Sequence, residues 1–193
     1  MCIRDSYTYC RWAQKNTNRS EVNIAQVSPV RWFQTGMSSI RTLLLDGESP
    51  KGCKRCHVME QHHKVSGRQK QLLKWGVTQD QFVETLLSSD WLPVLDHSYH
   101  DRGDTTQTPQ DWQIDLGNFC NSACVFCNPQ YSSRLATEYH KLGWIKNMPE
   151  RAWCDDPDLL QSFVQDLKRC DRLVYLHFIG GETLITPAFR TIL

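Results

Sequence analysis

Three cysteines within eight residues constrain this chain more than any other feature of its sequence. Cys120, Cys124 and Cys127 lie in the stretch CNSACVFC, separated by three and then two residues. On a tight loop, this spacing lets all three sulfurs point at one centre. A structural zinc site needs four protein ligands, and its cysteines usually come as two separated pairs. Three thiolates around an iron–sulfur cube leave one iron without a protein ligand, so the spacing favours chemistry over a purely structural role.

The surroundings of this stretch carry a resemblance to a known family. An aromatic residue, Phe126, stands just before the third cysteine, residues 114–119 precede the stretch, and Asn128-Pro129 and then Ser132-Ser133 follow it. The run 116–139 is similar to radical S-adenosylmethionine (SAM) proteins that carry an N-terminal twitch (half-SPASM) domain. Gly180-Gly181-Glu182 lies about where that superfamily places its SAM-binding Gly-Gly-Glu turn.

The resemblance implies a radical SAM enzyme with a [4Fe–4S] cluster. Cys120, Cys124 and Cys127 would each bind one iron, and the fourth iron would chelate the amino and carboxylate groups of SAM. An electron, delivered by a donor such as a flavodoxin or ferredoxin, would cleave SAM, and the resulting 5′-deoxyadenosyl radical would take a hydrogen atom from the substrate. A peptide is one expected substrate because related enzymes often modify peptides; sugars and nucleotides stay open.

Four further residues are expected to bind the cofactor. Gly180 and Gly181 have no side chains, so a ligand can approach their backbone closely. Glu182 can accept a charge-assisted hydrogen bond from the SAM ammonium. Phe126 would pack near the adenine, or simply within its loop. Thr183 departs from the proline that the family often has after the turn.

A second group of cysteines, Cys53 and Cys56 followed by His57, has three interpretations. The pattern CxxCH is a haem c attachment signature, but no export signal is visible. A CxxC pair is also half of a zinc site. Third, residues 47–56 with the later Glu60, Ser66 and Arg68 resemble the twitch segment, where such cysteines hold an auxiliary iron–sulfur cluster.

An auxiliary cluster normally needs about four cysteine ligands. Cys53 and Cys56 supply two, and Cys10 is a candidate for the third. The nearby His57, His62 and His63 fit a solvated helical face better than a ligand set. Two other cysteines, Cys154 and Cys170, are expected to be structural, because buried free thiols are ordinary. Asp115, before the motif, is expected either to face a barrel interior or to pair locally.

Composition restricts the class of protein. The chain has 193 residues, 40% hydrophobic residues and a net charge of +1, so a strongly basic nucleic-acid surface is not expected. No apolar run approaches the length of a membrane span. The nine cysteines, without a visible signal peptide, favour a reducing cytoplasm with cysteines committed to metal. Residues 1–6 resemble translated adaptor sequence, and a helix has barely begun when the chain stops, so we expect a piece of a longer protein, itself with weak or no SAM cleavage.

The predicted fold class is α/β. Residues 112–116 and 173–179 read as strands, and each precedes one of the two chemical loops. Ser132 or Ser133 caps a helix through Leu142, and Asp156-Pro157 opens another with an apolar stripe. In a β/α barrel both loops would share the C-terminal rim, so Cys120 and Glu182 become neighbours. We therefore expect about two β/α units of a partial radical SAM barrel in residues 105–193, with a mostly helical α+β twitch-like domain in 1–104.

The first domain is less clearly patterned. Residues 27–33 are a weak strand candidate, 38–46 suit a short helix ending at Gly47, and 61–74 suit a helix ending at Gly76. Residues 78–87 combine a capping box with an apolar helical stripe. The polar, breaker-rich segment 101–110 reads as the linker between the domains.

Two other functions compete with the radical SAM hypothesis. One is a zinc-binding interaction module that uses Cys53, Cys56 and two of the later cysteines. The other is a chain that binds a cluster without turning anything over. Anaerobic loading with iron separates the first from the leading hypothesis by colour, and cleavage of SAM to 5′-deoxyadenosine separates the second.

Overall fold

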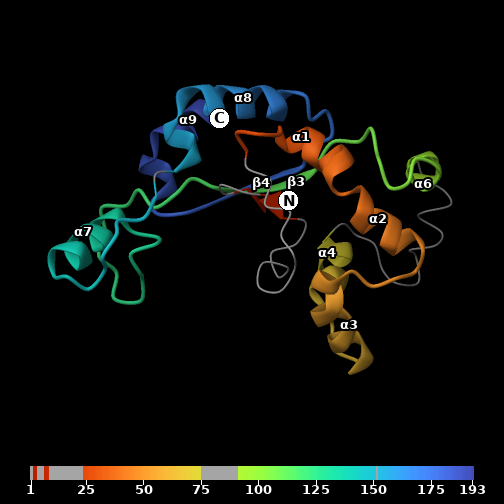
Figure 1. Ribbon diagram of the computed structural model, residues 1–193, viewed down its shortest axis with the longest axis horizontal. Helices are drawn as coiled ribbons and strands as arrows, with labels where there is room; N and C mark the ends of the chain where they lie inside the picture. Colours follow the sequence, from red (N-terminus) through yellow and green to blue (C-terminus); the bar gives the residue numbers. More distant parts are fainter. Residues whose placement is uncertain (1, 4–6, 9–23, 75–90, 151) are drawn as a thin grey trace. The chain divides into compact units, whose positions relative to one another are not determined.

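The computed structural model describes residues 2–3, 7–8, 24–74, 91–150 and 152–193 (Figure 1). Its elements in chain order are β1 (Cys2–Ile3), β2 (Tyr7–Thr8), α1 (Pro29–Arg31), the π-helical turn η2 (Trp32–Gly36), α2 (Ser38–Leu45), η3 (Lys51–Cys53), α3 (Lys54–Gln61), α4 (Gly67–Lys74), α6 (Trp91–His100), β3 (Asp111–Asp115), α7 (Ser133–Lys141), η4 (Trp153–Asp155), α8 (Pro157–Lys168), β4 (Tyr175–Ile179), η5 (Thr183–Ile185) and α9 (Pro187–Ile192). No helix in these ranges combines the length and the apolar character that crossing a bilayer requires. Cys10, Gly76 and residues 78–87 lie outside the described residues.

The chain forms two compact units. The sheet unit comprises the described residues of 1–8, 21–32 and 108–193, and the helical unit those of 33–107. The main segment of the sheet unit, residues 108–193, begins three residues after the predicted domain start at residue 105. The unit also includes residues 24–32, which were predicted to belong to the first domain. Whether the units correspond to a barrel and a twitch domain stays a prediction.

The sheet unit is built on the parallel pair β3 and β4. Trp112 is the Cα partner of Leu176 and Ile114 that of Phe178, and the sheet order is β2-β1-β3-β4. Trp112 and Ile114 are fully buried, as the alternation in residues 112–116 predicts. Both predicted strands are therefore present, and they run in the same direction, so their carboxyl ends lie at one edge of the sheet.

One face of this pair is covered by helices, with α8 and α9 lying along the same side of the strands (Figure 1). Asp156 caps α8 as predicted, since its side chain accepts hydrogen bonds from the backbone N–H groups of residues 158 and 159. Phe163 of α8 is only 1% exposed. Its ring meets Trp112 at 5.6 Å and Trp153 at 5.0 Å between centroids, both edge to face. Such aromatic contacts make Phe163 the centre of the core.

The weak strand prediction for residues 27–33 is wrong, because the chain is helical from Pro29 onward, through α1 and η2. Ser28 accepts a hydrogen bond from the N–H of Arg31, and Pro29 occupies the first helical position. This local capping outweighs the apolar residues that suggested a strand. The backbone N–H of Val30 then reaches the carboxylate of Asp166 at 3.5 Å, and Asp166 is only 3% exposed. A buried carboxylate of α8 thus holds α1 in the sheet unit.

In the helical unit, α2 matches the predicted helix 38–46 and ends before Gly47, whose φ is +77°. The segment predicted as a linker is folded against α2. Arg41 donates hydrogen bonds to the carbonyl oxygens of Gln34 and Gly103, at 3.0 and 2.8 Å, and Thr42 donates to Arg102 O at 2.8 Å. The polar, breaker-rich sequence of this segment predicted a linker. Its hydrogen bonds to Arg41 and Thr42 could not be predicted, because these partners lie far away in the sequence.

The helix predicted over 61–74 is present only as α4, residues 67–74; α3 ends at Gln61, and residues 62–66 between them are not helical. His63 at the break has a φ of +53°, which ends the helix. Ser66 and Gln69 then form a capping box: the Ser66 N–H donates to Gln69 Oε1 at 2.9 Å, and the Gln69 N–H donates to Ser66 Oγ at 3.2 Å. This reciprocal pair restarts the helix.

Replacing Phe163 by alanine should destabilise the sheet unit by about 3–5 kcal/mol, because truncation leaves a cavity between two tryptophans. Gln161→Ala, at an exposed position of the same helix, should change stability by less than about 0.5 kcal/mol. Chemical denaturation followed by tryptophan fluorescence measures both. Equal effects of the two variants would contradict the assignment of Phe163 to the core.

Candidate functional site

The two chemical loops are joined backbone to backbone. Hydrogen bonding continues past the end of the strands: Leu116 N–H donates to Ile179 O at 3.0 Å and Gly181 N–H to Gly117 O at 2.8 Å. Glu182 N–H then donates to Phe119 O at 2.7 Å. The Gly-Gly-Glu turn therefore lies directly against the residues that lead into Cys120. The neighbourhood expected from the parallel topology is confirmed by these bonds.

The glycines of the turn are needed for this contact. Gly180 has a φ of +132°, and a Cβ there would lie 2.4 Å from Gly117 O. A Cβ on Gly181 would lie 2.4 Å from Phe119 O. Any side chain would push the two loops apart. The structure therefore gives these glycines a packing role, and close approach of a ligand to their backbone stays a prediction.

The amino end of α7 holds the start of the cysteine loop. Ser133 Oγ accepts a hydrogen bond from Cys120 N–H at 3.1 Å and donates to Cys120 O at 3.0 Å. Ser132 caps α7, as predicted, and its Oγ also donates to Ser122 O at 2.8 Å. Arg134 Nη1 donates to Asn121 O at 3.2 Å. Sequence reasoning assigned the serines a capping role alone, because hydrogen bonds to a preceding loop leave no further signature.

The three thiols differ in their surroundings. Cys120 is half-buried, and its Sγ accepts a hydrogen bond from the Ser122 N–H at 3.4 Å. Cys124 is exposed, and Cys127 is half-buried with its N–H donating to Cys124 O at 3.0 Å. All three are free thiols. Within the described residues, no three His, Cys, Asp or Glu side chains converge as a metal site. The structure therefore places the cysteines on one loop without bringing their sulfurs together.

The residues present nevertheless fit an iron–sulfur group. Free thiols on one solvent-accessible loop are the soft donors that such clusters require. Two large apolar side chains beside them, Val125 and Phe126, are 101% and 95% exposed. The loop thus has donor atoms and apolar surface that the described fold does not use. Phe126 is accordingly accessible to a ligand rather than packed within its loop.

Glu182 is half-buried and begins the short helix η5. In the described part of the chain its carboxylate makes no hydrogen bond or ion pair, whereas its carbonyl oxygen accepts from Thr186 Oγ1 at 3.1 Å. The backbone of Glu182 is fixed on both sides while its charge stays available. A cationic ligand group could therefore bind here without breaking a contact.

Cys154 and Cys170 are buried, as expected for structural thiols. Burial raises the pKa of the Cys154 thiol to about 11, and Asp155 and Asp115 add to the effect. Burial likewise raises the pKa of Cys170 to about 11, with Asp166 and Asp171 adding to it. Cys154 Sγ donates to Leu116 O at 3.5 Å. A neutral, hydrogen-bonded thiol is a poor metal ligand.

Cys53 and Cys56 lie on consecutive turns, at the start of α3. Next to them, Glu60 accepts hydrogen bonds from Ser66 Oγ and from Arg68 Nε, the latter at 2.8 Å. The three residues whose spacing resembled the twitch segment therefore form one network. The Arg68 hydrogen bond, with smaller contributions from Ser66 and His57, lowers the pKa of Glu60 from 4.5 to about 2.

The three histidines near this pair do not share one environment. His62 and His63 are exposed, as a solvated face predicts. His57 is half-buried, and its Nε2 is buried with no hydrogen-bond partner among the described residues. An orphaned buried nitrogen costs about 1–3 kcal/mol. The solvated-face prediction is therefore wrong for His57.

Asp115 pairs locally, which was one of its two predicted roles. Its Oδ1 accepts a hydrogen bond from Gly117 N–H at 2.9 Å, and its side chain is buried. Its carbonyl oxygen accepts from Trp153 Nε1 at 2.8 Å. These bonds fix the end of β3 immediately before the cysteine loop.

Comparison with known proteins returned no match: no protein-family model, curated protein or solved structure is detectably similar to this chain.

Thiol reactivity should separate the loop cysteines from the buried ones. At about pH 8, near the ordinary thiol pKa, iodoacetamide should label Cys120, Cys124 and Cys127 well before Cys154 and Cys170, whose pKa of about 11 leaves little thiolate. Labelling of the buried pair should rise as the pH approaches 11. Peptide mass spectrometry measures each site, and unfolded protein, in which the sites should react alike, is the control. Equal rates in the folded protein would contradict the burial argument.

Stability of the helical unit should depend on Glu60 and on pH. Because folding lowers its pKa from 4.5 to about 2, its contribution is complete above about 4.5 and is lost as the pH falls toward 2. Glu60→Gln should cost about 1 kcal/mol near pH 7 and much less at about pH 2. Urea denaturation followed by circular dichroism measures this. Glu48→Gln, at an exposed position, is the control, and a constant Glu60 effect at all pH values would refute the ion-pair argument.

Proposed function

We propose that the chain is part of a radical SAM enzyme, in which Cys120, Cys124 and Cys127 hold a [4Fe–4S] cluster. The observation that carries the proposal is the backbone pairing of the Gly-Gly-Glu turn with residues 117–119. A cluster-bearing loop and a SAM-binding turn must be neighbours for one ligand to touch both. Two motifs sixty residues apart in sequence here meet through hydrogen bonds of 2.7 and 2.8 Å.

On this proposal the chain's own residues bind and position the cofactors. Ser133 fixes the backbone of Cys120, so one of the three sulfurs has a defined starting position. The Glu182 carboxylate accepts a hydrogen bond from the SAM ammonium, and Phe126 covers the adenine. When bound and reduced, the cluster supplies the electron that cleaves SAM. A flavodoxin or ferredoxin is the expected electron source, in a reducing cytoplasm that keeps the thiols free.

The pair Cys53 and Cys56 is proposed as part of an auxiliary iron–sulfur site. The adjacent network of Glu60, Ser66 and Arg68 gives this short segment a defined backbone, which a site of few ligands needs. The buried Nε2 of His57 adds a polar atom beside the pair that lacks a partner within the described chain. Further ligands are required, because two cysteines do not complete such a cluster.

Anaerobic loading with iron and sulfide tests the main site. The double variant Cys53→Ala/Cys56→Ala isolates it, and this protein should turn brown and bind roughly four irons per chain. Adding Cys124→Ala should abolish the colour, because two thiolates hold the cube poorly. Cys124 is chosen because it is exposed, so its loss should leave the fold intact.

Adding Cys170→Ala to the same double variant is the matched control, and it should leave the colour and the iron content unchanged. A colourless protein with bound zinc would support the zinc-binding module instead. Absence of iron after loading, in a protein that circular dichroism shows to be folded, would refute the cluster.

A further inference from the structure

Positive charge is concentrated in one short part of the helical unit, residues 51–74, which we call the basic segment. It comprises η3, α3, the non-helical residues 62–66 and α4 (Figure 1). It contains seven lysines and arginines and a single acidic residue, Glu60. The chain as a whole has 22 basic and 21 acidic residues, so its net charge of +1 averages this segment with a remainder that is net acidic. The absence of a strongly basic surface, expected from the net charge, therefore does not extend to these residues.

The single acidic residue of the basic segment is already paired within it. Glu60 of α3 accepts a hydrogen bond from Arg68 Nε of α4 at 2.8 Å, and the Arg68 guanidinium also reaches its second oxygen. This pair joins the two helices, so their cations belong to one folded surface. Lys54, Lys64 and Lys70 are exposed and form no ion pair among the described residues. Like charges held close together repel one another, and an anionic partner relieves that repulsion.

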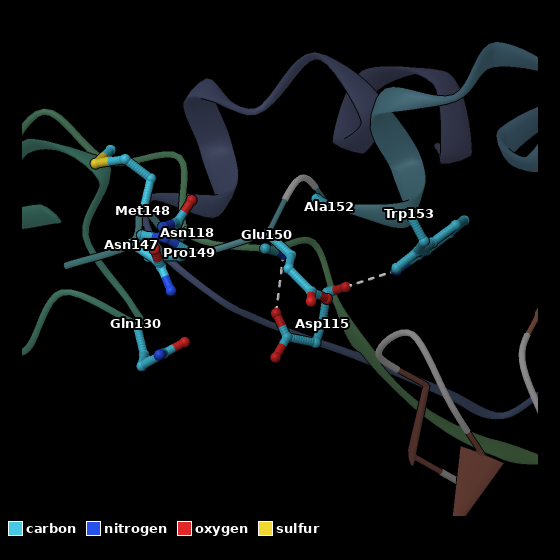
Figure 2. A pocket seen from close by; sticks show the side chains of 10 residues that line it. Asp115, Asn118, Gln130, Asn147, Met148, Pro149, Glu150, Ala152 and Trp153 are labelled. Atoms are coloured by element: carbon cyan, nitrogen blue, oxygen red, sulfur yellow. Dashed lines mark hydrogen bonds between the residues drawn. The ribbon is translucent and has the colours of Figure 1, made fainter. Parts of the chain in front are cut away.

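The three exposed lysines are distributed as a chain of phosphates requires. Lys54 begins α3, Lys64 lies between the helices and Lys70 lies in α4. A small anion needs several donors around one centre, whereas a nucleic-acid backbone presents a negative charge every few ångströms along its length. The sheet unit has no comparable series of cations in its pocket at the end of β3, because the described residues that line it include two acidic ones and no lysine or arginine (Figure 2).

The other exposed side chains of the basic segment favour a single strand over a membrane. A helix that lies on a membrane needs a continuous apolar face. The large apolar side chains that are exposed here are instead scattered, with Val58 in α3, Val65 between the helices and Leu73 in α4. His62 and His63, both exposed, offer planar rings on which unpaired bases can stack.

We propose that the basic segment binds single-stranded nucleic acid through its phosphates, with Lys54, Lys64 and Lys70 as the main contacts. Phosphate contacts carry no sequence information, so binding has little sequence preference. RNA and single-stranded DNA offer the same phosphate chemistry. The segment belongs to the helical unit, whereas the cysteine loop and the Gly-Gly-Glu turn belong to the sheet unit. The inference therefore goes beyond the proposed function and does not depend on it.

Fluorescence anisotropy with labelled oligonucleotides tests the binding. The probes are oligo(U), oligo(dT) and a DNA duplex, each of about 20 nucleotides per strand, which exceeds the length that one binding site usually covers. Both single strands should bind, and more tightly than the duplex. The logarithm of their affinity should fall with the logarithm of the salt concentration with a slope of about −2, because about three phosphate contacts contribute about −0.7 each. Tighter binding of oligo(U) than of oligo(dT) identifies RNA as the ligand, and the reverse identifies DNA.

Two charge-matched variants locate the binding. The triple variant Lys54→Gln/Lys64→Gln/Lys70→Gln should weaken oligonucleotide binding at least about tenfold and bring the salt slope close to zero. The control removes the same number of charges from exposed lysines of the sheet unit, in the triple variant Lys141→Gln/Lys146→Gln/Lys168→Gln. The control should bind within about twofold of the native chain, because the charges that it loses lie outside the basic segment. Circular dichroism checks that both variants are folded.

Two further probes separate nucleic acid from other anionic partners. Oligo-glutamate of the same length should bind at least about fivefold more weakly than oligo(U), because it lacks bases that stack. Vesicles of phosphatidylcholine with about one quarter phosphatidylserine should not bind.

The inference is overturned if neither single strand binds at low salt, if the duplex binds more tightly than both, or if the two triple variants weaken binding equally. Equal binding of oligo-glutamate would show attraction to any polyanion, and binding to vesicles without binding to oligonucleotides would show a membrane surface. A chain that loads iron but binds no oligonucleotide refutes this inference alone. One that binds oligonucleotides but takes up no iron refutes the cluster alone.

Discussion

The site depends on backbone pairing that continues beyond the carboxyl ends of the parallel strands β3 and β4. Three more hydrogen bonds join the chain segments beyond the strands and carry the Gly-Gly-Glu turn onto residues 117–119. The pairing is possible because Gly180 and Gly181 lack a Cβ, which would lie 2.4 Å from a carbonyl oxygen in each case. Two backbones at this distance leave no room for a side chain between them, so the turn lies in direct contact with residues 117–119.

The hydrophobic core holds this edge of the sheet in place. Phe163 contacts Trp112 and Trp153 edge to face, and the indole N–H groups of those tryptophans donate to Pro109 O and Asp115 O, at 3.0 and 2.8 Å. The tryptophans therefore act at both ends of β3: their rings fill the core and their polar atoms fix the strand. The packing of α8 against these tryptophans therefore fixes the position of β3, from which the cysteine loop departs.

Elements with local signals were predictable from sequence, and elements that depend on distant partners were not. The helices that begin after Asp156 and Ser132 could be predicted, because an N-cap depends only on residues within the first turn. The segment 101–110 reads as a linker, yet Arg41 and Thr42 bind its carbonyl groups, and those partners are some sixty residues away. The helix at residues 29–31 was not predicted, because the apolar residues around it suggested a strand. The cysteine motif was visible in sequence, but its anchoring by Ser133 was not, since a serine at a helix start already has a sufficient explanation.

The open arrangement of the three thiols follows from how the loop is held. Ser133 fixes Cys120 at one end, and the turn between Cys124 and Cys127 is closed by a single backbone hydrogen bond of 3.0 Å. Nothing in the described fold holds Cys120 against this turn. The apolar side chains within the turn, Val125 and Phe126, face solvent. Metal-ligand bonds commonly supply the free energy that orders such a segment. On the proposed function, cluster binding therefore completes the fold of this loop, whereas residues 117–119 before it are already paired with the Gly-Gly-Glu turn.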